Sequence, residues 1–224
     1  MYKGLVTSGC SFSLYDISHN EHGWPCYLQQ QLLSDGILSE DFDSFHRGLG
    51  GNGNMLIARN TYDALNQLLK KGIKGEDILC IVQWSSISRH QIFLEKDDDY
   101  YLMYSHEDGL GRIYHRYFQN HINDVINGLW NWTTLQNYCE VNNIKPYYTF
   151  MFEHDKEMLL DDELGGKHAW EYLRDDIKRD NVLISITKYL EEHRMKNLFV
   201  PDGHPSTRGH KIFSDYLIKG LTCI

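Results

Sequence analysis

Short apolar runs alternate along the chain with longer stretches in which apolar residues recur three and four positions apart. Residues 4–8 form a run that ends at Gly9, and residues 78–82 form an unbroken one, as in a parallel strand buried on both faces. Weaker strand candidates are 42–46, 146–152 and 197–200. The helical spacing predicts helices over residues 24–33, 54–69, 117–141, 168–194 and 206–217.

The alternation of strands with helices predicts an α/β fold, in which a parallel sheet carries helices on both sides. The 224 residues suit one domain, since a chain of this length buries a sizeable core without disulfides or a structural metal. The segment from about 88 to 115 fits the alternation poorly and includes an acidic run. We therefore interpret 1–224 as a single domain with an insertion at about 88–115, a hairpin or a lid near the carboxyl edge of the sheet.

Composition and charge narrow the range of partners. The chain has 22 Lys and Arg against 31 Asp and Glu, and this formal charge of −9 argues against a nucleic-acid partner. No apolar stretch approaches the ~20 residues of a membrane span, and the polar N-terminus lacks the pattern of a signal peptide. The five cysteines are widely spaced, as in a reduced compartment. We expect a cytoplasmic protein, or a virion-associated one if it is virally encoded, and its oligomeric state stays open.

Candidate chemistry lies in the turns that follow the predicted strands, because ligands of an open parallel sheet bind beyond the carboxyl ends of its strands. Three such turns are residues 9–13, 48–54 and 83–86, and a fourth segment, 201–205, follows the last predicted strand. The first turn contains a serine, the second is rich in glycine, and the fourth contains a histidine.

Ser11 in the first turn is a candidate nucleophile, and His204 from the other end of the chain is its candidate base. A serine hydroxyl needs a base at neutral pH, and neutral imidazole is the usual one. The imidazole needs an acceptor on its second nitrogen, and Asp202 is the nearest carboxylate in sequence. The oxyanion that follows needs N–H donors, which glycine-rich turns supply.

These segments resemble a known family. Residues 9–13 (GCSFS), 48–54 and 202–210 (DGHPSTRGH) look like the first, second and fifth blocks of the SGNH (GDSL-like) hydrolases, in the family's order. The resemblance covers the chain from about residue 4 to 220. It implies a three-layer α/β/α, flavodoxin-like fold and an esterase or lipase activity. It also implies that Ser11 is the nucleophile, that His204 is the base, and that the backbone N–H groups of Ser11 and Gly51 form an oxyanion hole.

Three positions depart from the family's pattern. Cys10 stands where the family usually has Asp, and Asp202 lies two residues before the histidine where the common spacing is three. The third block, which usually supplies an Asn side chain to the oxyanion hole, reads Gln-Trp-Ser-Ser over 83–86. The loss of one such donor costs about 3 kcal/mol in the transition state.

Several residues are candidates to replace the missing donor. Ser85 falls at the position of the Asn, although its hydroxyl is shorter, and Gln83 ends the same strand. Asn52 and Asn54 of the second turn are the other candidates, and we expect both, with Trp84, to contact the substrate.

Other chemistries have weaker signals. Residues 48–53 spell GxGxxG, a dinucleotide fingerprint, but the acidic residue expected about twenty positions later is missing. The 12 histidines form no HExxH motif and no cluster with cysteine. We therefore expect neither a cofactor nor a metal.

The sequence thus predicts a serine esterase that hydrolyses a carboxylic ester through a Ser-His-Asp mechanism, with O-acetyl groups of carbohydrates as a candidate substrate class. The alternative is a catalytically weak or inactive module of the same fold that binds a glycan or another partner, since the oxyanion Asn is missing. Ser11 and His204 favour the enzyme, because a binding module has no physical need of either.

Overall fold

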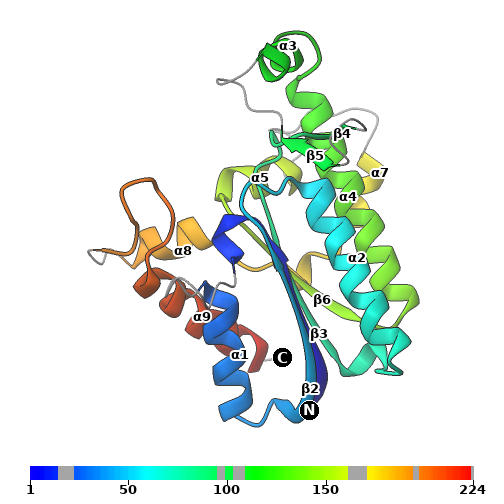
Figure 1. Cartoon of the computed structure of the whole chain (residues 1–224), viewed down its shortest axis with the longest axis vertical. Helices are drawn as coiled ribbons and strands as arrows, with labels where there is room; N and C mark the ends of the chain where they lie inside the picture. Colours follow the sequence, from blue (N-terminus) through cyan, green and yellow to red (C-terminus); the bar gives the residue numbers. More distant parts are fainter. Residues whose placement is uncertain (15–22, 95–98, 103–108, 161–170, 194–196, 223–224) are drawn as a thin grey trace.

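A parallel sheet forms the centre of the computed structural model, which describes residues 1–14, 23–94, 99–102, 109–160, 171–193 and 197–222. Its four strands are β1 (Tyr2–Gly9), β2 (Leu38–Gly48), β3 (Ile78–Trp84) and β6 (Lys145–Phe150). They lie in the order β2-β1-β3-β6 (Figure 1). Because β1 has β2 on one side and β3 on the other, the carboxyl end of β1 is the switch point at which such sheets bind ligands.

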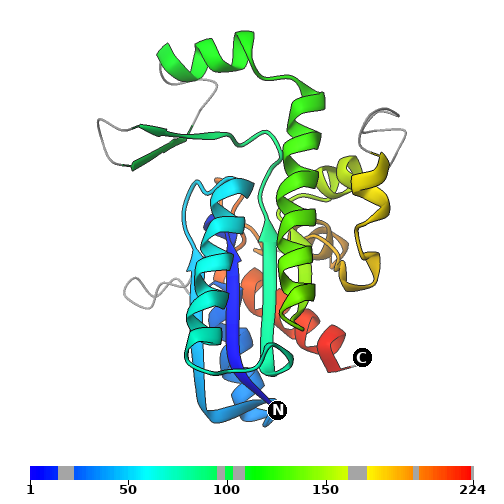
Figure 2. The same ribbon diagram turned by 90° about the vertical axis from the view of Figure 1, so that its right-hand side faces the viewer.

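Helices cover both faces of the sheet. One face carries α1 (Trp24–Ser34), α8 (Ile186–Glu192) and α9 (Thr207–Thr222), and the other carries α2 (Asn54–Lys70) and α4 (His121–Val141). Figure 2 shows α2 and α4 in front of the sheet and the red α9 behind it. The predicted three-layer α/β/α fold is confirmed. Shorter elements are η1 (Ser11–Ser13), η2 (Gly75–Asp77), α5 (Glu153–Leu160), α7 (Glu171–Asp175) and η3 (Arg179–Asn181).

Two apolar cores hold these layers together. Successive side chains of a strand point to opposite faces, so Val6 and Val82 join the core beneath α2 and α4, whereas Leu5 and Ile81 join the core beneath α1 and α9. All residues of β3 are buried, as its unbroken apolar run over 78–82 predicted.

The predicted helix over 168–194 is wrong in its length. The described part contains two short helices, α7 and α8, separated by ten residues, and 168–170 and 194 lie outside the described residues. Within that interval, Leu183 N donates to Tyr148 O at 2.7 Å, and Val182 forms a parallel bridge with Tyr148. The backbone therefore bonds to the free edge of β6 instead of to its own preceding turn.

The predicted strand over 197–200 does not join the sheet. Val200 N donates to His204 O at 2.8 Å, and Ser206 N donates to Leu198 O at 2.8 Å. The segment thus closes a local hairpin on the chain that follows it, and this hairpin carries His204.

Residues 91–118 are called the arm below, and their described parts stand apart from the sheet beyond its carboxyl end (Figures 1 and 2). The arm contains an antiparallel hairpin of β4 (Gln91–Leu94) and β5 (Asp99–Leu102), followed by α3 (Gly109–Tyr117). Residues 95–98 and 103–108 of the predicted insertion lie outside the described residues. None of the described helices combines the length and the apolar character that a membrane crossing requires.

Candidate active site

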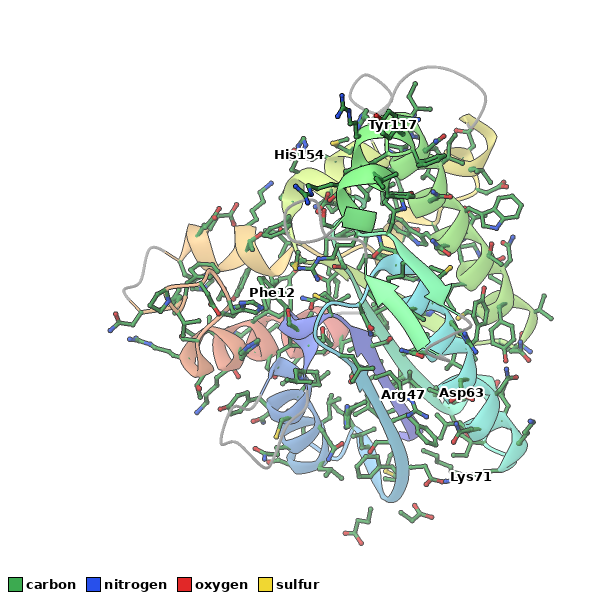
Figure 3. The ribbon with its side chains drawn as sticks, turned by 45° about the horizontal axis from the view of Figure 1, so that its top comes forward. Phe12, Arg47, Asp63, Lys71, Tyr117 and His154 are labelled. Carbon is green, nitrogen blue, oxygen red and sulfur yellow. The ribbon has the colours of Figure 1, made fainter. Side chains whose placement is uncertain are left out.

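Ser11 lies at the switch point of the sheet. β1 ends at Gly9, and the chain turns at once into η1, where Ser13 N donates to Cys10 O at 2.9 Å. Figure 3 labels Phe12, which marks this turn at the end of β1. The turn therefore places the Ser11 hydroxyl at the edge where a ligand is expected.

Two glycines allow the turn to pack this closely. A Cβ at Gly9 would lie 2.4 Å from Ser13 Oγ, and a Cβ at Gly48 would lie 2.0 Å from Ser13 O. Ser13 Oγ donates to Gln83 Oε1 at 2.5 Å and accepts the indole N–H of Trp24 at 3.1 Å. The segment that carries Ser11 is thus anchored to β2, β3 and α1.

His204 meets Ser11 from the opposite end of the chain. His204 Nε2 and Ser11 Oγ are 2.8 Å apart, across 193 positions of sequence. The chain bends back before the histidine at Gly203, which has a φ of +86°. The Phe12 ring packs against the imidazole with their centroids 4.9 Å apart, so it limits the orientations of His204.

Asp202 lies beside His204 and remains largely in solvent. Its Oδ1 accepts the backbone N–H of His204 at 3.0 Å and lies 3.2 Å from His204 Nδ1, with 69% of the Asp202 side chain exposed. The direction of the second contact does not make a hydrogen bond, and Nδ1 has no hydrogen-bond partner among the described residues. The hydrogen bond from the His204 backbone is the main cause that lowers the pKa of Asp202, so its carboxylate is ionised at neutral pH.

The glycine-rich second turn, residues 48–54, is hydrogen-bonded to the end of β1. Leu49 N donates to Gly9 O at 3.3 Å, and the Asn52 side chain donates to the same oxygen at 3.2 Å. Between them, Gly51 adopts a φ of +77°, a conformation that favours glycine. The turn is therefore fixed beside the turn that contains Ser11.

A cleft of about 320 Å³ opens beside Ser11 and His204. Its wall includes His210 on the first turn of α9, whose pKa is lowered to about 4 by burial and, secondarily, by the charge of His204. His210 is therefore neutral at neutral pH. The sequence reasoning missed Phe12 and His210, although His210 lies four residues after Ser206 and hence on the same side of α9.

Solved structures match nearly the whole chain. A member of the lipolytic G-D-S-L family from Veillonella parvula is 11% identical, with a TM-score of 0.54 and coverage of 99% of this chain and 99% of that one. A psychrotrophic esterase from Pseudoalteromonas sp., inhibited by monoethylphosphonate, is 12% identical, with a TM-score of 0.54 and coverage of 98% and 97%. No protein-family model and no curated protein sequence matches the chain.

The chain has the SGNH (GDSL-like) hydrolase fold. The resemblance drawn from three short blocks of sequence is therefore confirmed at the level of the fold. Residues 83–86, which correspond to the family's third block, lie at the carboxyl end of β3, beside β1 in the sheet. We therefore expect the replacement for the missing oxyanion donor to lie near the carboxyl end of β3.

Ser85 and Gln83 do not present their side chains to the cleft. Ser85 is fully buried, and its hydroxyl lies close enough to the Cys10 thiol to lower the pKa of that thiol, although burial raises it more. Ser85 Oγ makes no hydrogen bond of good geometry within the described residues. Gln83 is also fully buried and accepts from Ser13. The expectation that Ser85 takes the place of the Asn is therefore not supported.

Asn54 contacts the backbone of Ser85, the residue that falls at the position of the missing Asn. Its Oδ1 accepts the backbone N–H of Ser85 at 2.8 Å, which sets its side-chain amide directly beside the end of β3. The amide Nδ2 makes no hydrogen bond to a described residue and remains available as a donor. Asn52, by contrast, is 3% exposed and uses its Nδ2 on Gly9 O.

Trp84, which was expected to contact the substrate, is buried in the core instead. Its side chain is 1% exposed, and its ring stacks on that of Tyr148 with centroids 6.2 Å apart. The reason is the alternation of β3, which points Trp84 into the core beneath α2 and α4 together with Val82. Asn52 is likewise a structural residue of the second turn and lies away from the surface.

The Cys10 thiol has no contact with solvent. It is fully buried, and its Sγ lies 3.5 Å from Met151 Sδ. Burial raises the pKa of the thiol. A carboxylate at this position would lose its hydration here, so the cysteine suits the site that surrounds it.

Proposed function

We propose that the chain is a serine esterase that hydrolyses a carboxylic ester. The observation that carries this proposal is the 2.8 Å contact between Ser11 Oγ and His204 Nε2 at the switch point of an SGNH-fold sheet. A hydroxyl and an imidazole at this distance can exchange a proton directly, which is the first requirement of a nucleophilic serine.

The reaction runs in two acyl transfers. His204 Nε2 takes the proton of Ser11 while Ser11 Oγ bonds to the ester carbonyl carbon, and the carbonyl becomes an oxyanion. When this intermediate collapses, the bond to the alcohol breaks and His204 gives its proton to the leaving alcohol. Water then repeats the attack on the acyl-serine, with His204 again as base, and releases the acid.

Three donors would stabilise the oxyanion. The backbone N–H groups of Ser11 and Gly51 are the first two, as the resemblance to the family implies. We assign the third to Asn54 Nδ2, because Asn54 already bonds to the backbone at the end of β3. Removal of a donor of this kind costs on the order of a hundredfold in rate.

Asp202 would orient the imidazole and stabilise its protonated form. The carboxylate is ionised at neutral pH and 3.2 Å from His204 Nδ1, so a small rotation completes the hydrogen bond. Its exposure weakens the interaction, because water screens the charge. We therefore assign Asp202 a smaller share of the rate than Ser11 or His204.

A small acyl group such as acetyl, on a carbohydrate alcohol, is the substrate that we favour. The cleft beside Ser11 holds about 320 Å³, and hydroxyl, imidazole and carboxylate groups contribute to its wall. A site of this size and polarity suits a sugar ester better than a long acyl chain.

Labelling by a fluorophosphonate tests the proposal, because this probe reacts only with an activated serine. We expect peptide mass spectrometry to locate the label at Ser11, with no label in Ser11→Ala and a large decrease in His204→Ala. A screen of acetylated sugars would follow. If the folded parent stays unlabelled, the esterase is excluded and a glycan array would test the binding module.

A further inference from the structure

A second cleft, of about 420 Å³, lies between the N-terminus of α2, the segment after β3 and the middle of α4. Asn54, the proposed third oxyanion donor, is part of its wall, so the cleft adjoins the proposed reacting centre. The wall also contains Arg89, together with the exposed side chains of Met55 and Trp130.

Arg89 contributes a positive charge that lies within electrostatic range of Asp155 but forms no direct ion pair with a described residue. Its Nη1 is buried without a hydrogen-bond partner among the described residues. The neighbouring acid, Asp155, uses its Oδ1 to accept from Ile87 N and Ser86 Oγ, both at 3.4 Å. A partly buried guanidinium whose Nη1 has no partner among the described residues is costly, and a carboxylate ligand would satisfy it.

The N-terminus of α2 lies beside Arg89 and adds to the positive electrostatic potential in the cleft. A Cβ at Gly53 would lie 2.5 Å from Arg89 O, so Arg89 packs directly against the start of α2. α2 has 17 residues, no side chain caps its N-terminus, and its first turn contains no acidic residue. The N–H groups of that turn therefore favour an anion in the same cleft.

The charge of Arg89 also acts on Cys10, the residue before the proposed nucleophile Ser11. It lowers the pKa of the Cys10 thiol, against the larger effect of burial, which raises it. The guanidinium is therefore within electrostatic range of the turn that carries Ser11.

We propose that Arg89 determines specificity by binding a carboxylate of the ester substrate in this second cleft. This inference rests on the proposed esterase function. The carboxylate belongs to the acyl part or to the alcohol part of the ester, and the apolar side chains of Met55 and Trp130 contact the uncharged remainder. The guanidinium forms a bidentate pair with the carboxylate, which is the geometry that arginine favours.

Three chromogenic or ultraviolet-detected esters test the inference. 4-Nitrophenyl acetate is neutral, 4-nitrophenyl hydrogen succinate has the carboxylate on the acyl part, and 4-acetoxybenzoate has it on the alcohol part. For each protein, the measured quantity is the ratio of kcat/KM for an anionic ester to kcat/KM for the neutral one. Arg89→Gln is compared with Arg116→Gln, which removes the same charge from the exposed surface of α3.

We expect Arg89→Gln to lower this ratio by about tenfold to a hundredfold for one of the two anionic esters, which identifies the part that carries the carboxylate. Arg89→Lys should restore part of the loss, and Arg116→Gln should leave the ratio unchanged. An equal ratio in parent and Arg89→Gln for both anionic esters would overturn the inference.

A binding measurement separates this inference from the esterase proposal. Isothermal titration of monomethyl succinate and of 4-acetoxybenzoate into Ser11→Ala needs no turnover. We expect Arg89→Gln, in the Ser11→Ala protein, to weaken binding of one of them at least tenfold. If Arg89→Gln leaves binding to the Ser11→Ala protein unchanged, the carboxylate site is rejected even if the parent is an active esterase. If Arg89→Gln weakens binding but the parent hydrolyses none of the esters, only the esterase proposal is rejected.

Discussion

Asp155 is a buried carboxyl close to the candidate site, and its pKa makes the stability of the fold depend on pH. It lies at the start of α5, is 6% exposed, and accepts from Ile87 N and Ser86 Oγ on the segment that leads to Arg89. Burial raises the pKa of Asp155 to about 6, and the two hydrogen bonds and the Arg89 charge lower it by less. The folded protein therefore binds this proton more tightly than the unfolded chain does.

The pKa of Asp155 sets the direction of a pH effect on stability. Between about pH 4 and pH 6 the unfolded chain releases the proton and the folded protein keeps it, so the free energy of unfolding falls as the pH rises. Asp155→Asn removes this effect and keeps an acceptor for Ile87 N–H. We expect the variant to gain roughly 2–3 kcal/mol relative to the parent between pH 4 and pH 7.

Urea unfolding of both proteins at pH 4, 5, 6 and 7 measures this difference. The comparison between pH values removes any constant effect of the substitution itself. A difference between parent and variant that is the same at every pH would show that the folded pKa of Asp155 is not raised.

At the scale of elements, the turn of Ser11 depends on its neighbour β2. Gly48 ends β2, and its Cα faces the backbone of η1 so closely that a Cβ would lie 2.0 Å from Ser13 O. The backbone of η1 cannot yield as a flexible side chain would. The position of the nucleophile is thus set by a glycine on a different strand.

Gly48→Ala should therefore displace η1. We expect the folded variant itself to be less active, in addition to any loss caused by its lower stability. We expect a loss of about 1–3 kcal/mol in the free energy of unfolding, the usual cost of an overpacked site. We also expect slower labelling of Ser11 by the fluorophosphonate under conditions where the variant is fully folded. Gly50→Ala is the matched control, because a Cβ there would meet nothing within 4 Å.

If Gly48→Ala and Gly50→Ala label at the same rate, contact between β2 and η1 does not position the nucleophile. If both variants lose stability equally, the effect comes from the flexibility of the loop and not from the close approach.

At the scale of the whole molecule, the arm stands outside both cores. Neither core contains a residue between 111 and 118, the continuous part of the arm whose side-chain burial the structure describes. The chain before the arm and the chain after it meet, since Gln119 Nε2 donates to Ser88 O at 3.5 Å and His90 Nε2 lies 2.6 Å from Asp124 Oδ1. A short linker can therefore span the gap.

Replacement of residues 92–118 by a short Gly-Ser linker should leave a folded protein. We expect one cooperative urea transition and a free energy of unfolding within about 2 kcal/mol of the parent value, because residues 111–118 of the arm belong to neither core. Loss of the cooperative transition would show that the arm is part of the folding unit and would contradict the interpretation of this segment as an insertion.

The sequence by itself determined the features that rest on local chemistry. Short continuous apolar runs define β1 and β3, and the spacing of three and four defines α1, α2 and α9. Ser11 and His204 could be paired because short motifs at both ends of the chain carry them and because parallel strands end at one edge of a sheet.

Only the tertiary structure decided features that depend on competition between distant partners. Residues 182–184 leave the helical pattern because the edge of β6 offers them hydrogen bonds, and 197–200 pairs with the chain around His204. Trp84 turns inward because of the register of β3, whereas Asn54 takes the place beside it through a bond to Ser85 N. Arg89 is brought into electrostatic range of Asp155 and of the Cys10 thiol by the folding of segments far apart in the sequence.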